Sequence, residues 1–248
     1  LSAYSGKNAE NISLNAITNN PLPNWSINYS GLINIDFFKE RFKKFSLGHA
    51  YRSSYTLNNF KSNLEYNPSN TQLTDDSGNY INEFLYTNIN LVEQFNPLLK
   101  IDMELNNSLQ IVMSLKKDRA LSLSLDNNLL TESNGTDYSI GLGYRIKDLK
   151  FTNRVGGKRR VSKGDLNIKT DLNFRDNITI IRNLNIEDNK VTAGQKMWSL
   201  KTSADYNLSK SFNAIFFYDH LFSKFAISTA FPMTTIRAGM TLRYNFGE

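Results

Sequence analysis

The chain has 248 residues, a formal net charge of +6 and no cysteine, which excludes disulfides and thiolate metal sites. The chain has only two histidines, His49 and His220, which argues against a histidine-ligated metal site and against a Ser-His-Asp triad. We expect no catalytic residue, no cofactor and no metal. Basic residues are spread along the chain instead of gathering among exposed aromatics, which argues against nucleic-acid binding.

The mean hydropathy of the chain does not distinguish a soluble protein from a membrane β-barrel. The mean hydropathy of −0.43 is typical of a soluble protein, but alternating strands dilute each apolar residue with a polar neighbour. No apolar run of about 18 residues exists, which excludes a transmembrane helix. The first ten residues lack a signal-peptide pattern, so we expect such a peptide to be removed or to lie upstream. We predict one domain over residues 1–248, with an irregular lead-in over 1–20 and strands and loops over 21–248.

The amino-terminal part mixes strand and helix periods. Trp25, Ile27 and Tyr29 alternate with polar residues after two prolines, which predicts a strand. Residues 35–45 have aromatic residues at helical spacing and several basic residues, which predicts a short amphipathic helix. It is expected on a membrane surface, against a partner, or as a connector in the mouth of a barrel formed by its own chain. Alternation resumes near Phe45 and, after a turn, near Phe60, while residues 67–79 predict an external loop.

The central part predicts tightly spaced hairpins. Residues 99–105 and 109–115 alternate around an Asn106–Asn107 turn, and a further strand follows residues 116–119. Residues 138–146 form the next strand, with two glycines on its polar face that admit a bend or a close neighbour. The basic stretch 156–165 is interpreted as a solvated loop or as a site for anionic lipid or a partner.

Three final hairpin segments complete the pattern. Residues 166–174 and 178–186 predict strands around a turn at 175–177, and Arg182 on the apolar face predicts a bulge, an interface position or a protein neighbour. Residues 198–206 and 212–218 form the penultimate hairpin. The last strand, 233–246, alternates apolar residues with Arg237 and Arg243, as expected of a tilted membrane strand or, alternatively, the last strand of a soluble β-domain.

The pattern as a whole predicts an all-β, antiparallel transmembrane barrel wall of about fourteen strands with one short amphipathic helix. Leu123, Leu142 and Met240 are expected near the middle of the bilayer. The expected lipid-facing residues are Leu121, Leu123, Leu125, Leu142, Ile236, Met240 and Leu242. The expected aromatic anchors at the membrane interface are Trp25, Tyr144, Trp198, Tyr218, Tyr244 and Phe246.

Several segments resemble the carboxy-terminal region of the SprA/Sov family, the outer-membrane translocons of the bacterial type 9 secretion system. The resemblance covers about residues 11–248. Its most specific stretches are HAYRSSY and FPMTTIRAGMTLRYNF. The other matching segments are PLPNWSINYSGL, FKKFSLGHAYRSSYTLNNFKSNLEY, EQFNPLL, RALSLSLDNNLLTE and GLGYRIKDLKF. Family members are many times longer, so the resemblance implies the last strands of a very large barrel.

The resemblance also implies a location and partners. It implies a channel in the cell outer membrane that passes folded secreted proteins. The implied partners are the remainder of the barrel, a PorV-like outer-membrane shuttle protein, a periplasmic plug protein, a peptidyl-prolyl isomerase, secreted substrates and membrane lipids. The alternatives are a stand-alone fourteen-stranded porin or lipid or small-molecule transporter, an outer-membrane enzyme, and a soluble adhesin.

Overall fold

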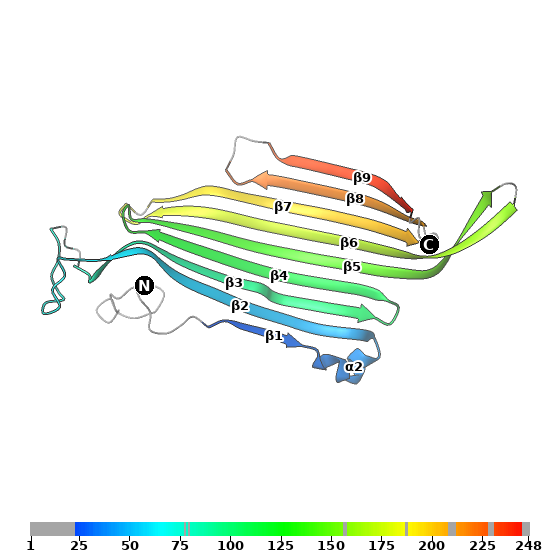
Figure 1. Ribbon diagram of the computed structural model, residues 1–248, viewed down its shortest axis with the longest axis horizontal. Helices are drawn as coiled ribbons and strands as arrows, with labels where there is room; N and C mark the ends of the chain where they lie inside the picture. The colour runs from blue at the N-terminus through cyan, green and yellow to red at the C-terminus, as the bar shows by residue number, and fades with distance from the viewer. Residues whose placement is uncertain are drawn as a thin grey trace.

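The described residues form one antiparallel sheet of nine strands in the order β1-β2-β3-β4-β5-β6-β7-β8-β9, so each strand pairs with its neighbours in sequence (Figure 1). The computed structural model describes residues 23–76, 78, 80–155, 158–186, 188–207, 212–227 and 231–244, without the side chains of 151–155 and 158–162. The predicted all-β, antiparallel architecture is confirmed. The strands are β1 (Trp25–Tyr29), β2 (Phe42–Ser62), β3 (Phe84–Leu105), β4 (Leu109–Ser124), β5 (Leu129–Val155), β6 (Lys158–Asn183), β7 (Asp188–Asn207), β8 (Phe212–Phe225) and β9 (Met233–Tyr244).

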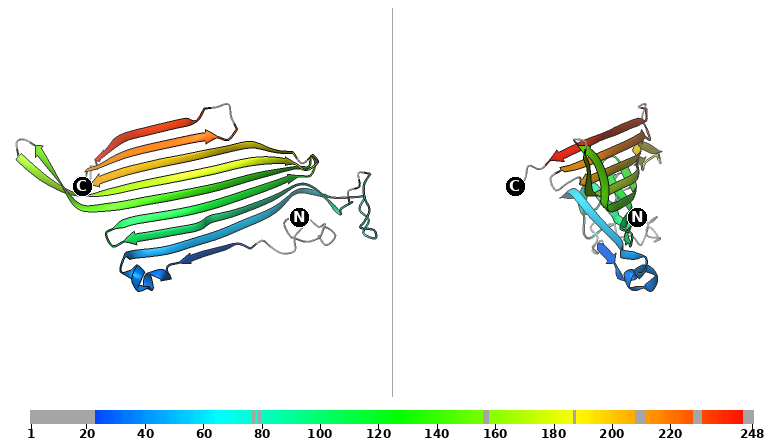
Figure 2. Two further views of the ribbon diagram at one scale, coloured as in Figure 1. Left: turned by 180° about the vertical axis from the view of Figure 1, so that it is seen from behind. Right: turned by 90° about the vertical axis from the view of Figure 1, so that its right-hand side faces the viewer.

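The sheet is a single layer that does not close on itself. Seen from its end, it twists without a second sheet or a helical layer packed on it (Figure 2). Among the described strands, β1 and β9 each pair on one side only. The sheet therefore has two free edges with backbone groups available for further pairing.

The strands are longer than predicted. The described residues therefore form nine strands, whereas about fourteen were predicted. The turn predicted at residues 175–177 is wrong, because β6 and β5 stay in register there, with Arg175 opposite Asp137. The break predicted at 116–119 is wrong for the same reason, since β4 continues to Ser124. Short polar stretches in the sequence predict turns. Here the charged side chains of such a stretch pair with side chains of the neighbouring strand, as Arg175 does with Asp137 at 3.5 Å, so the strand continues.

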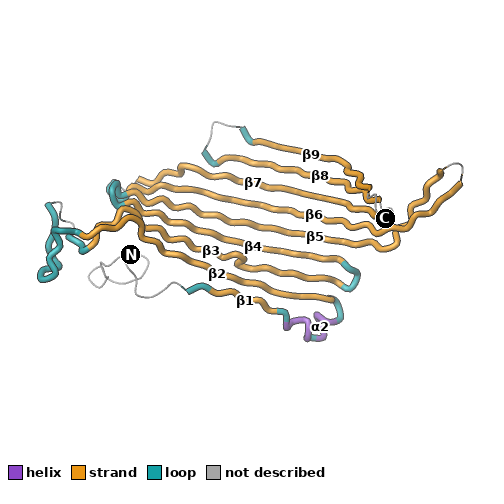
Figure 3. The backbone as a smooth tube through the Cα atoms, in the orientation of Figure 1, coloured by secondary structure: helices purple, strands orange, loops and turns teal. Residues whose placement is uncertain are grey.

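Two other predicted elements differ in extent. The predicted helix at 35–45 is reduced to one turn, α2 (Asp36–Lys39), because Phe42 and Phe45 already pair with β3. A 3₁₀ turn, η2 (Gly31–Asn34), precedes it. The basic stretch 156–165, interpreted as a loop, belongs to β6 from Lys158 onward, while residues 156 and 157 lie outside the described residues. The Asn106–Asn107 turn and the irregular connection between β2 and β3 agree with the prediction (Figure 3).

The sheet has almost no hydrophobic core. Only Ala50, Tyr206 and Ala214 are buried apolar residues among those described. The accessible surface is 17979 Å², whereas a compact protein of 28.4 kDa exposes about 11,000 Å². A sheet is stable only when its apolar face is covered, so this surface requires a covering layer. No helix of the described part has the length and apolar character to cross a bilayer.

Candidate functional site: two unlike faces of one sheet

The cross-strand register separates the side chains into two faces. Residues that are directly opposite one another point to the same side of a sheet. Starting from Ile140 on β5, one row of register partners crosses from β1 to β9 and contains only one polar residue, His220. The row consists of Tyr29, Leu47, Ile101, Met113, Ile140, Leu172, Leu200, His220 and Ile236.

This row is the centre of an apolar belt, which we define as the apolar residues on its face between two groups of aromatic side chains. The belt side chains are extensively exposed, for example 42% for Ile140 and 54% for Met240. Contiguous exposed apolar surface of this extent marks contact with a membrane or with another protein.

Aromatic side chains border the belt on both sides. The first group stacks from strand to strand, with ring centroids of Trp25 and Tyr51 4.5 Å apart and those of Tyr51 and Phe95 4.8 Å apart. It consists of Trp25, Tyr51, Phe95, Tyr138, Phe174, Trp198 and Phe222. The second group borders the opposite side and consists of Tyr144, Tyr206, Phe212 and Tyr244. On β7 the two borders, Trp198 and Tyr206, are roughly 27 Å apart along the strand.

The predicted aromatic anchors fall into three groups. Trp25, Trp198, Tyr144 and Tyr244 lie in the two aromatic borders. Tyr218 lies inside the belt, opposite Thr202 and Ala238. Phe246 lies outside the described residues.

The predicted lipid-facing residues also separate by position. Leu142, Ile236, Met240 and Leu242 are belt residues, because their register positions place them on the apolar face beside the central row. Leu121 and Leu123 point to the same side but lie on β4 beyond Arg119, away from the belt. Leu125 lies in the turn after β4 and is 38% exposed.

Four charged residues run diagonally across the same side of the sheet, beside Leu121 and Leu123. They are Glu93, Arg119, Glu132 and Arg182, one each from β3, β4, β5 and β6, and we call them the charged ladder. Arg182 Nη2 lies 2.8 Å from Glu132 Oε2, and Arg119 Nε lies 3.3 Å from Glu132 Oε1. At the other end Arg119 Nη1 lies 3.9 Å from Glu93, whose carboxylate accepts a 2.8 Å hydrogen bond from the Tyr51 hydroxyl.

Glu132 is the centre of the ladder and its side chain is only 12% exposed. It lies six residues before Tyr138, outside the belt. The hydrogen bond from Arg182, and secondly that from Asn134, hold the pKa of this carboxyl below its ordinary value of 4.5. The expectation that Arg182 has a bulge or a protein neighbour is confirmed, since the β6–β7 register shifts at Thr179/Ile180 and Glu132 pairs with it.

The ladder is the feature that sequence reasoning missed. Each of its residues occupies an apolar-face position of a long strand, where a polar residue suggests a strand end. Two carboxylates and two guanidinium groups on four consecutive strands were the available signal, but that they lie next to one another is known only from the pairing.

The opposite face is polar. Lys44 and Asp102 pair across β2 and β3 at 2.7 Å, and Arg237 and Asp219 across β9 and β8 at 2.9 Å. Gly141 has the expected close neighbour, since a Cβ there would lie 2.9 Å from Asp171 Oδ1. We call this side the polar face.

The two histidines have structural surroundings. His49 Nδ1 lies 2.6 Å from the carbonyl oxygen of Leu98, where the β2–β3 register shifts, and thus satisfies a carbonyl that the irregular pairing leaves free. His220 packs on the Trp198 ring, with centroids 4.6 Å apart. The described residues contain no group of three or more potential metal ligands.

Comparison with models of known protein families gave no match, and comparison with curated proteins gave none either. The class of this protein therefore rests on its sheet: an antiparallel, single-layer β-protein with one apolar and one polar face.

Proposed function

We propose that the sheet is part of the wall of a transmembrane β-barrel, with the apolar belt against lipid and the polar face toward an aqueous lumen. The single observation that carries the proposal is the belt, which crosses the nine described strands and has an aromatic border on each side, the second of them on β5, β7, β8 and β9. With strands tilted at 35–45°, the roughly 27 Å between Trp198 and Tyr206 corresponds to about 21 Å across the membrane, close to the ~25 Å apolar band of outer-membrane barrels.

The charged ladder supports this placement because it lies outside the belt. Leu123 is ten residues from Met113, the β4 residue at the centre of the belt, or roughly 33 Å along the strand. Even at a tilt of about 45° this exceeds half of the ~30 Å hydrocarbon core. We therefore revise the mid-bilayer expectation for Leu123 and keep it for Leu142 and Met240.

We further propose that the barrel is a protein-conducting channel of the cell outer membrane that exports folded proteins in type 9 secretion. This proposal is supported by the resemblance to the SprA/Sov family, whose two most specific stretches coincide with β2 and β9. The free edges of β1 and β9 fit a wall that continues into further strands. The shuttle, plug and isomerase partners implied by the resemblance belong to the same proposal.

Single cysteines test the two faces, because the chain has no cysteine of its own. Ser114 and Met113 are adjacent on β4 and point to the polar face and to the belt. In intact membranes we expect a water-soluble maleimide to label Ser114→Cys and to leave Met113→Cys unlabelled. Labelling of Met113→Cys with protection of Ser114→Cys would contradict the barrel proposal.

The same variant tests secretion. Attaching a bulky maleimide to Ser114→Cys is expected to reduce export of a secreted protein without reducing the amount of barrel in the membrane. If labelling changes only the flux of small solutes and protein export continues, the porin or transporter alternative is favoured.

A further inference from the structure

A basic cavity of about 330 Å³ opens on the polar face where β3 and β4 turn and the β5–β6 hairpin continues beyond them (Figure 1). Leu109 and Tyr144 are the last paired residues of β4 and β5, so β5 has a free side from Arg145 onward. The register shift between Ile146 and Leu149 follows, and Asp148 has a φ of 52°. This step in the sheet exposes side chains from neighbouring strands to one space.

The residues that line the cavity include more cations than anions. Lys43, Arg145, Lys147 and Lys169 line it together with one acidic residue, Glu104. Lys43 Nζ is 3.9 Å from Glu104, and Arg145 is bound to Asp165 beside the cavity at 2.5 Å. Among the described residues, Lys147 and Lys169 form neither a hydrogen bond nor an ion pair, and both are exposed. An excess of two positive charges is therefore available to a ligand.

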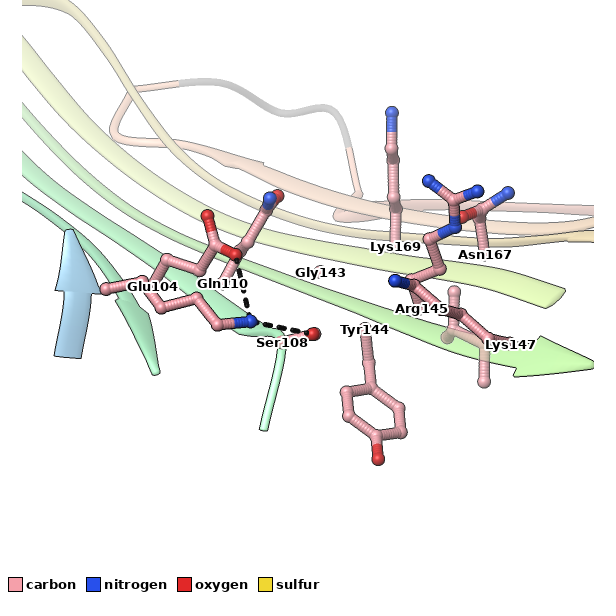
Figure 4. Close-up of a pocket in the computed structure, with 11 residues that line it drawn as sticks. Glu104, Ser108, Gln110, Gly143, Tyr144, Arg145, Lys147, Asn167 and Lys169 are labelled. Atoms are coloured by element: carbon pink, nitrogen blue, oxygen red, sulfur yellow. Dashed lines mark hydrogen bonds and ion pairs between the residues drawn. The ribbon is translucent and has the colours of Figure 1, made fainter. Parts of the chain in front are cut away.

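Arg145 and Lys169, two of the cations that line the cavity, are on the polar face, away from the belt. Figure 4 shows Arg145, Asn167 and Lys169 pointing together to one side of the strands, while the Tyr144 ring points to the other. Tyr144 belongs to the aromatic border of the belt, so a lipid headgroup would meet the opposite side from these cations. The ligand must reach the cavity from the lumen.

The cations are spread too widely for one small anion. Lys43 is on β2 and Lys169 on β6, four strand spacings away, or roughly 19 Å. A single phosphate contacts only neighbouring side chains, whereas an extended peptide of about six residues spans roughly 20 Å. Gln110 and Asn167 line the same space and add neutral amide donors between the charges.

We propose that this cavity binds an acidic, extended polypeptide segment on the lumenal side of the wall, as a contact site for protein in transit. The inference rests on the proposed function, because it needs the polar face to line an aqueous channel. Binding would be electrostatic and multidentate, so it weakens as salt screens the charges.

The test is equilibrium binding of a fluorescent deca-glutamate peptide in detergent to the full-length polypeptide, by which we mean the protein as the cell makes it, with residues 1–248 and any further strands of the proposed barrel. We expect saturable binding that weakens about tenfold in the double variant Lys147→Gln/Lys169→Gln. The matched control is Lys100→Gln/Lys116→Gln, which removes two lysines of the polar face that do not line the cavity. The control should bind within about twofold of the unmodified protein.

Two other probes separate the alternatives. Deca-glutamine should not bind, and neither pyrophosphate nor phosphatidylglycerol vesicles should compete at concentrations comparable to that of the peptide. Equal loss in both double variants, no peptide binding, or binding of vesicles in place of peptide would overturn the inference. Maleimide labelling of Ser114→Cys in the same preparation measures separately whether the polar face is exposed to water. The inference about the cavity can therefore fail while the proposed function stands.

Discussion

At the scale of single residues, position along a strand decides the role as much as the face does. Leu123 and Leu142 are both leucines on the same side of the sheet, but Arg119 and Glu132 lie between Leu123 and the belt. The two leucine side chains therefore have different surroundings. Only the pairing register reveals the difference, because both leucines alternate with polar neighbours in the sequence.

Leu142→Arg is expected to destabilise the folded protein in lipid vesicles by about 2–4 kcal/mol, because it places a charge in the apolar belt. The measurement is urea unfolding followed by fluorescence of the full-length polypeptide.

Two controls accompany this variant. Ser139→Arg, on the polar face between Ser114 and Asn173, should cost less than about 1 kcal/mol, as should Leu123→Arg beyond the ladder. A larger cost for Ser139→Arg than for Leu142→Arg would mean that the two faces are reversed.

At the scale of elements, the strands extend past the belt because cross-strand charges stabilise their polar ends. The ladder joins β3 to β6, and Lys196–Asp176 at 3.0 Å links β7 to β6 between the ladder and the belt. Surface ion pairs contribute little one at a time, but Glu132 bridges two guanidinium groups and is largely enclosed. The ladder is thus expected to fix the register of these long strands.

Glu132→Gln is expected to destabilise the protein by about 2 kcal/mol at neutral pH, because Arg119 and Arg182 lose the carboxylate that they share. The pKa of Glu132 is lowered in the folded state, so its stabilising contribution is complete above the ordinary value of 4.5. The contribution is lost as the pH falls below 4.5 through the lowered pKa.

Thermal unfolding of the wild type and of Glu132→Gln between pH 7 and pH 3 measures the contribution of the Glu132 carboxylate to stability. The difference between wild type and Glu132→Gln should shrink as the solution becomes acidic. Lys190→Gln, which removes an exposed pair within β7, is the matched control and should leave stability nearly unchanged. A difference that stays constant over the pH range would contradict the role of the Glu132 carboxylate.

At the scale of the whole molecule, the sheet exposes far more surface than a compact protein of its mass and has two unpaired edges. Backbone groups exposed to hydrocarbon cost several kcal/mol each, so an open sheet cannot remain in a membrane with its edges free. The proposed barrel therefore needs further strands that pair with β1 and β9.

Residues 1–248 alone are expected not to refold into a closed barrel. In detergent they should give aggregates or no species whose electrophoretic mobility changes on heating, since neither edge has a partner. The full-length polypeptide serves as the positive control. A homogeneous, ion-conducting monomer formed by residues 1–248 would contradict the larger wall and support a stand-alone porin.

The sequence by itself determined the strand type, the alternation of the two faces and the belt positions of Leu142, Ile236, Met240 and Leu242, because side-chain direction in a strand follows a period of two residues. It did not determine strand length, since a polar stretch inside a long strand and a polar turn have the same composition. Only the tertiary structure decided that Arg175 stays in a strand opposite Asp137, and that Glu132 joins Arg119 to Arg182. These contacts link residues far apart in the chain. The register between strands decides which side chains become neighbours, and local sequence does not encode that register.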